Sequence, residues 1–237
     1  MRKYLYLAAI IFSLRCNRAN ERNQDTLFSL LPASKTNIDF NNKLKEDEDN
    51  NVLSYQYFYN GGGVAIGDVN NDGLQDIYFS GNMTDDKLYL NKGDLQFDDV
   101  TKAAGVVGRS DSWKTGVTMA DVNGDGKLDI YVCYSGKFSG EKRMNQLFIN
   151  EGNDKNQIPK FSEQAQQYGI ADSSYSTQAY FFDYDKDGDL DMLLLNHDIK
   201  FHSNLDQSIL ELLLKTNDHV SIVKLYRNDN NHFSEVT

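Results

Sequence analysis

A nine-residue acidic pattern, D-x-[DN]-x-D-G-x-x-D, occurs three times in this chain and constrains its fold more than any other feature. The three copies span residues 68–76, 121–129 and 183–191. A tight loop with oxygen-bearing side chains at alternating positions suits a hard cation of the size of Ca²⁺. The glycine at position six of each copy permits the positive φ that a sharp turn around an ion requires.

The pattern defines a set of candidate metal ligands. Positions one, three, five and nine would supply side-chain oxygens, and position seven would supply a backbone carbonyl oxygen. The candidates are Asp68, Asn70, Asp72, Leu74 and Asp76; Asp121, Asn123, Asp125, Lys127 and Asp129; and Asp183, Asp185, Asp187, Asp189 and Asp191. We therefore expect about three Ca²⁺ sites. We also expect the third to bind differently, because its extra aspartates make it the most negative loop.

The residues around each copy exclude an EF-hand, which needs a glutamate at position twelve and a helix on each side of the loop. Position twelve is Phe79, Val132 or Leu194, and none of these can bind a metal ion. Segments that precede and follow each copy are rich in β-branched and aromatic residues, which favours strands. Each acidic loop is therefore predicted to join two β-strands.

Each copy belongs to a longer repeat that predicts two further strands. The third strand of each repeat is expected at 87–91, 146–150 and 224–228, and the fourth at 97–101, 161–165 and 233–237. Four antiparallel strands per repeat is the plan of a propeller blade. The expected blades span about 55–105, 106–170 and 171–237, the last of them truncated. Three blades cannot close a ring, so we expect an all-β, partial β-propeller.

The first 16 residues resemble an export signal. A positively charged start precedes an apolar run, residues 4–14, that is too short to span a bilayer. Cys16 follows, as in a bacterial lipoprotein signal, although Arg15 stands where such signals carry a small residue. We expect an exported protein of the cell envelope or outer surface, either lipid-anchored at Cys16 or cleaved elsewhere. Residues 17–54 are expected to form a tether and lead-in segment.

These motifs resemble FG-GAP or VCBS repeats over residues 55–237. The run at 57–68, YFYNGGGVAIGD, is also similar to exported repeat proteins related to cartilage acidic protein, which often carry a C-terminal ASPIC/UnbV domain. The resemblance implies a β-propeller with calcium in its blade loops. It implies less about the biological role, because propellers host many functions.

The charge of the chain limits the classes of partner. The formal net charge is −11, and the three acidic patterns hold eleven of the 35 acidic residues. This acidity argues against nucleic acid, since phosphates need a basic face. We expect a calcium-binding module with structural ions that binds a protein or glycan ligand at the cell surface.

Catalysis is the alternative function. A polysaccharide-active enzyme built on a propeller, or a part of one, could use a pair of carboxylates. Most regularly spaced acids are already assigned to the ion loops, however, and the sequence contains no G-x-S-x-G or His-x-x-x-His motif. We therefore expect no catalytic residues, and no cofactor other than calcium.

Overall fold

The computed structural model describes residues 27–199, 207–208, 211, 215 and 222–237. It divides the chain into two units, Met1–Pro32 and Ala33–Thr237. The expected signal with Cys16 and the start of the expected tether lie outside the described residues. Among the described residues, no helix combines the length and hydropathy needed to cross a bilayer.

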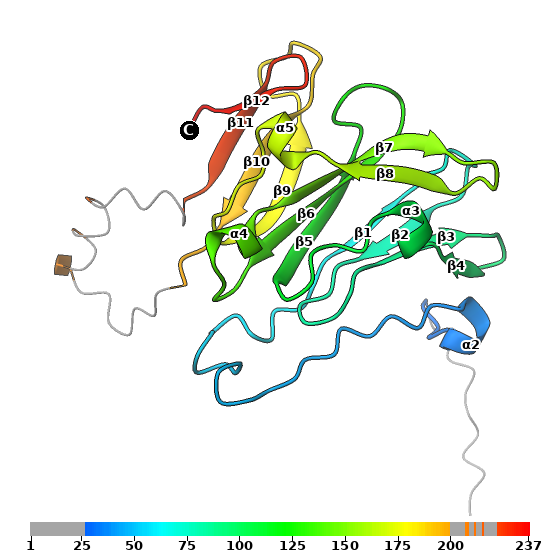
Figure 1. The fold of residues 1–237 in the computed structure, drawn as a ribbon, viewed down its shortest axis with the longest axis horizontal. Coiled ribbons are helices and arrows are strands. Elements are labelled where there is room, and N and C mark those ends of the chain that lie inside the picture. The colour runs from blue at the N-terminus through cyan, green and yellow to red at the C-terminus, as the bar shows by residue number, and fades with distance from the viewer. Residues whose placement is uncertain (1–26, 200–206, 209–210, 212–214, 216–221) are drawn as a thin grey trace, which may run out of the picture. The chain divides into compact units, whose positions relative to one another are not determined.

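The second unit contains three antiparallel sheets of four strands each (Figure 1). Blade 1 consists of β1 (Val64–Gly67), β2 (Asp76–Phe79), β3 (Lys87–Asn91) and β4 (Phe97–Asp99). Blade 2 consists of β5 (Trp113–Ala120), β6 (Asp129–Ser135), β7 (Gln146–Asn153) and β8 (Pro159–Glu163). Blade 3 consists of β9 (Ser176–Phe182), β10 (Asp191–Asn196), β11 (Lys224–Asn228) and β12 (Phe233–Glu235). Strands adjoin in chain order within each sheet, which confirms the predicted four-stranded blades and partial propeller.

Blade 2 packs between the other two blades. All seven residues of β6 are buried, although alternate side chains of a strand point to opposite faces. Val132 shares a hydrophobic cluster with Tyr78 of blade 1. The next residue, Cys133, shares a second cluster with Met192 of blade 3. The two faces of blade 2 therefore build two separate cores, one against each neighbour.

The fourth strands end two residues earlier than predicted: β4 and β12 are shorter, whereas β8 keeps its predicted length but also begins two residues earlier. In blades 1 and 2 a short helix follows the fourth strand. These two helices are α3 (Thr101–Ala104) and α5 (Ala165–Tyr168). Two further short helices are α2 (Ala33–Thr36), which precedes β1, and α4 (Gly140–Arg143), which lies between β6 and β7. The backbone N–H of Thr101 donates to Asp99 Oδ1 at 3.0 Å, which turns the chain out of β4. Gly105, with a φ of 84°, then ends α3 in the left-handed conformation.

Asp39 and Phe40 of the lead-in segment pack on the face of blade 1 that points away from blade 2. The ring of Phe40 stacks on that of Phe79, with 4.8 Å between centroids. The hydroxyl of Tyr89 donates to Asp39 Oδ1 at 2.7 Å. Phe79 and Tyr89 alternate with residues that face blade 2, so the lead-in takes the place of a neighbour on this side.

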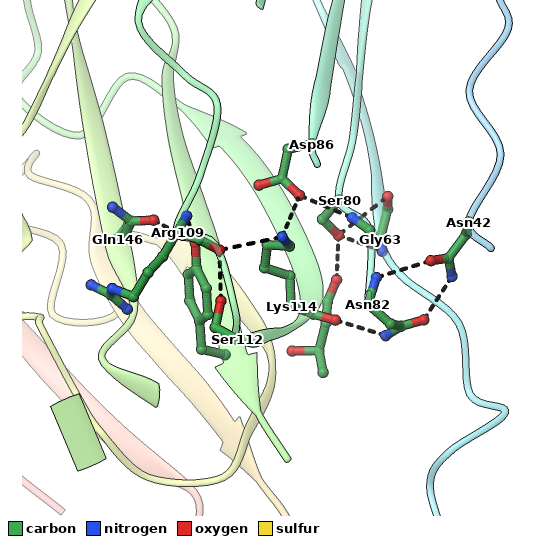
Figure 2. Close-up of polar contacts among 12 residues, drawn as sticks. Asn42, Gly63, Ser80, Asn82, Asp86, Arg109, Ser112, Lys114 and Gln146 are labelled. Carbon is green, nitrogen blue, oxygen red and sulfur yellow. Dashed lines mark hydrogen bonds and ion pairs between the residues drawn. The ribbon is translucent and has the colours of Figure 1, made fainter. Parts of the chain in front are cut away.

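Polar groups tie blade 1 to blade 2 in the seam drawn in Figure 2. Lys114 Nζ lies 3.8 Å from Asp86 Oδ1, and both side chains are almost fully buried. The side-chain amide of Asn82 donates to the carbonyl of Lys114 at 2.8 Å. The hydroxyl of Ser80 donates to the carbonyl of Thr115 at 2.5 Å. The first two blades thus share hydrogen bonds as well as a hydrophobic core.

Candidate metal centres

The three acidic loops occupy the same place in each blade, between the first and second strands. Position nine of each loop is the first residue of the second strand. It pairs with the last residue of the first strand, as Gly67 with Asp76, Ala120 with Asp129 and Phe182 with Asp191. The glycines at position six have φ values of 87°, 82° and 99°, as the predicted sharp turn requires.

Position one turns into the loop in blades 1 and 2. In blade 1, Asp68 accepts hydrogen bonds from the backbone N–H groups of Asp72 and Gly73, at 3.1 and 2.7 Å. In blade 2, Asp121 accepts from the equivalent groups of positions five and six at 3.0 and 2.8 Å. The carboxylate of position one therefore lies within the turn, held by amides of the same loop.

Positions three and five also face each other across the turn in blade 1. The side-chain amide of Asn70 donates to Asp72 Oδ2 at 3.0 Å. Asp72 Oδ1 accepts the backbone N–H of Leu74 at 2.9 Å. The structure therefore brings together the side chains of positions one, three and five in blade 1 through hydrogen bonds within the loop.

The loop of blade 2 carries a cation of its own. Lys127 Nζ lies 2.6 Å from Asp125 Oδ2. Partial desolvation raises the pKa of Asp125, but hydrogen bonds from Lys127 and Asn123 and the charge of Lys127 together outweigh it, so the pKa is lowered. An ammonium group at this position competes with a metal ion for the same carboxylate. The loop in blade 1, with Leu74 at position seven, has no such competitor.

Position nine has a second role that the sequence did not reveal. Asp76 accepts hydrogen bonds from the backbone N–H groups of Val69 in the loop and Asn91 at the end of β3, at 2.9 and 2.8 Å. Asp129 and Asp191 make the same pair of contacts in their blades. All three carboxylates are buried, and burial raises the pKa of Asp76 and Asp129 to about 6. Position nine thus fastens the loop to the third strand.

The loop of blade 3 shows the clearest group of metal-type ligands. Asp183, Asp185 and Asp187 each place a carboxylate oxygen within 4.8 Å of the others, and all three residues are exposed. Partial desolvation and then the charge of Asp187 raise the pKa of Asp185. Asp189 and Asp191 lie outside this group of three. A set of hard, mutually repelling oxygens in a sharp turn fits a divalent cation such as Ca²⁺.

An asparagine at the fifth position of each third strand makes further contacts at this corner. The side-chain amide of Asn150 donates to the carbonyl of Leu128 in its own blade at 3.1 Å and to that of Val69 in blade 1 at 2.8 Å. Asn228 makes the same two types of contact, the second one to the carbonyl of Val122 in blade 2 at 3.4 Å. Within the described part of the chain, the side-chain amide of Asn91 donates only to the carbonyl of Gln75 in its own blade, at 3.0 Å. The recurrence of Asn at this place in all three repeats was the sequence signal for this role.

Two comparisons with known proteins agree with this geometry. A family model described as an FG-GAP-like repeat matches residues 68–132, which include the first two acidic loops. Cartilage acidic protein 1 of Xenopus tropicalis is 36% identical to this chain over 89 residues. That alignment covers 36% of this chain and 13% of the Xenopus protein, so the chain matches a small part of that relative.

Proposed function

We propose that this chain, which contains FG-GAP-like repeats of the kind found in the cartilage acidic protein group, is a calcium-stabilised binding module of an exported protein. The observation that carries the proposal is the cluster of three carboxylates formed by Asp183, Asp185 and Asp187. This cluster lies in a turn that recurs between the first and second strands of each blade. The signal-like start of the chain supports export. The module would bind a protein or glycan at the cell surface and perform no catalysis.

The ions have a structural role in this proposal. Each loop joins the first two strands of a blade, and its position-nine aspartate is fastened to the third strand. A metal ion held by the loop therefore stabilises three strands together, and part of its binding free energy becomes folding free energy. The protein itself supplies all the expected ligands, so no open position for a substrate is required.

The three loops should differ in affinity. The loop of blade 3 has five aspartates, whereas the loop of blade 2 has three and an ammonium group 2.6 Å from one of them. We expect the tightest site in blade 3 and the weakest in blade 2, because affinity rises with the charge of the ligands. A calorimetric titration with Ca²⁺ should therefore resolve more than one class of site, and three indistinguishable sites would contradict this ranking.

Thermal unfolding with Ca²⁺ and with a chelator tests the proposal. A ligand that binds only the folded state at 100 times its Kd stabilises it by about 2.7 kcal/mol per site. We expect Ca²⁺ to raise the melting temperature and Asp187→Asn to reduce that rise. The asparagine keeps the oxygen that accepts the N–H of Asp189 at 2.9 Å, so the chelated variant should melt close to the chelated parent.

Asp98→Asn is the matched control, because it removes one negative charge at an exposed position of β4 outside the loops. The control should respond to Ca²⁺ like the parent. A melting temperature that does not change with Ca²⁺, or an equal response of both variants, would refute calcium stabilisation through this loop.

A further inference from the structure

A pocket of about 270 Å³ lies where the innermost strands of the three blades begin. Its lining includes the glycine-rich segment 60–63 before β1, Trp113, Thr115 and Gly116 of β5, Thr177 and Gln178 of β9, and His197 just after β10. Tyr55 and Tyr57 complete the wall. The volume is slightly below the roughly 300–1,000 Å³ of typical small-molecule sites, which suits one ring of a ligand.

Apart from His197, the lining of this pocket carries no acidic or basic side chain. His197 is the one titratable imidazole, and burial lowers its pKa, so the ring is neutral at physiological pH. An anionic ligand would lack a cationic partner here, and a cationic ligand would lack a carboxylate. The pocket therefore favours an uncharged ligand.

Three polar side chains of the pocket have oxygen atoms that can accept further hydrogen bonds. The hydroxyl of Thr115 donates to the carbonyl of Ser176 at 2.8 Å, and that of Thr177 donates to the carbonyl of Leu195 at 3.0 Å. Each hydroxyl oxygen keeps free lone pairs after its proton is used. The amide N–H₂ of Gln178 is likewise used, on the hydroxyl of Thr118 at 2.8 Å. These three side chains therefore offer acceptors to a ligand that brings donors.

The side-chain oxygen of Gln178 lies against the backbone of Gly116. A Cβ at Gly116 would lie 1.9 Å from Gln178 Oε1, so only glycine leaves room for this oxygen beside the start of β5. Among the described residues, no donor is bonded to Gln178 Oε1. One further polar atom of the lining, His197 Nδ1, is buried and has no partner within the described part of the chain.

Aromatic rings supply an apolar wall. Tyr57 is partly buried, and its ring contacts His197 edge-on, with 4.2 Å between centroids. Tyr55 and Trp113, which also line the pocket, are almost completely buried. Tyr57 is thus the more exposed tyrosine of the wall. An aromatic ring beside hydrogen-bond acceptors matches a molecule with one apolar face and several hydroxyl groups.

We propose that this pocket binds one residue of a neutral saccharide. Tyr57 packs against the C–H face of the sugar ring, and Gln178 Oε1 with the two threonine hydroxyl oxygens accepts the sugar hydroxyls. The inference rests on the proposed function as a binding module and adds the ligand class and the site. The pocket and the metal loops lie at opposite ends of β1, β5 and β9, since each of these strands begins near the pocket and ends at a loop.

Binding of neutral disaccharides to the whole chain in Ca²⁺-containing buffer tests the inference. The probes are lactose, cellobiose, mannobiose and N,N′-diacetylchitobiose, with choline and a sulfated disaccharide as charged comparators, measured by calorimetry and by saturation-transfer NMR. We expect at least one neutral disaccharide to bind and neither charged comparator to do so. Tyr57→Ala should weaken binding at least tenfold, whereas Tyr57→Phe, which keeps the ring, should stay within threefold.

Tyr180→Ala is the matched control, because Tyr180 is an exposed tyrosine of β9 outside the pocket. It should bind the disaccharide like the parent, and a melt of each variant checks that it is folded. The proposal is overturned if no neutral disaccharide binds, if Tyr180→Ala weakens binding as much as Tyr57→Ala, or if choline binds in a Tyr57-dependent way. Calcium binding measured on the same samples reports on the proposed function separately, because Tyr57 lies at the other end of the blade.

Discussion

Asp86 shows how a single buried carboxylate can set the pH dependence of this fold. It lies in the seam between blades 1 and 2 and accepts hydrogen bonds from the hydroxyl of Tyr78 and the backbone N–H of Gly81, each at 2.9 Å. Burial raises its pKa to about 6, although Lys114 and these hydrogen bonds oppose the shift. The pKa of Asp86 is therefore about two units above that of an exposed aspartate.

We predict that Asp86 makes the protein less stable as pH rises from about 4 to about 7. The folded state keeps the proton of Asp86 up to about pH 6, whereas the unfolded chain releases it near pH 4. Between these values the folded state binds the additional proton, so raising the pH favours unfolding. A shift of two pKa units corresponds to about 3 kcal/mol. Urea unfolding of the parent and of Asp86→Asn should therefore show a difference that moves by about 2–3 kcal/mol in favour of the variant over this range.

Asp85→Asn provides the comparison, because it removes one charge at an exposed neighbouring residue. Its effect on the free energy of unfolding should be small. Parallel pH profiles for the parent and Asp86→Asn would contradict the prediction. A parent that gains stability relative to the variant as pH rises would mean that Lys114 dominates over burial.

Asparagines of the third strands connect blades 2 and 3 to the blade before each of them. Asn150 reaches a carbonyl of blade 1 as well as one of its own blade, whereas the side-chain amide of Asn91, among the described residues, donates only within its own blade. We predict that Asn150→Ala costs about 2–3 kcal/mol of unfolding free energy and Asn91→Ala about 1 kcal/mol, because buried carbonyls left without donors are costly. Chemical denaturation of both variants measures the difference, and equal losses would show that the contact between blades contributes little.

The sequence predicted the blades well because their signals are local. The acidic loops, the strand on each side of them and a Phe in each fourth strand recur in all three repeats, and they fix the order of the elements. The cover of blade 1 by the lead-in could not be predicted, because Phe40 and Phe79 meet only through the folded chain. The same holds for the pocket, whose wall combines Tyr57 with His197 from a distant part of the sequence.

At the scale of the whole molecule, the acidic loops concentrate charge at one end of the blades. The loops of blades 1 and 2 are close enough for the side chain of Asn71 to donate to the carbonyl of Gly126 at 3.1 Å. The three loops together hold eleven acidic residues in a chain of net charge −11. Without bound cations, these carboxylates repel one another and oppose the compact state.

We therefore predict that salt stabilises the protein more in a chelator than in Ca²⁺. Raising NaCl from 0.01 to 0.1 M shortens the Debye length from about 30 to about 10 Å, which weakens repulsion between loops. In chelator, a gain of about 1 kcal/mol would raise the melting temperature by about 2–4 °C. Bound Ca²⁺ already neutralises part of this charge, so the rise should be less than half as large. Tetramethylammonium chloride should act like NaCl if screening is the cause. Equal salt effects with and without Ca²⁺ would show that the loops do not carry the repulsion.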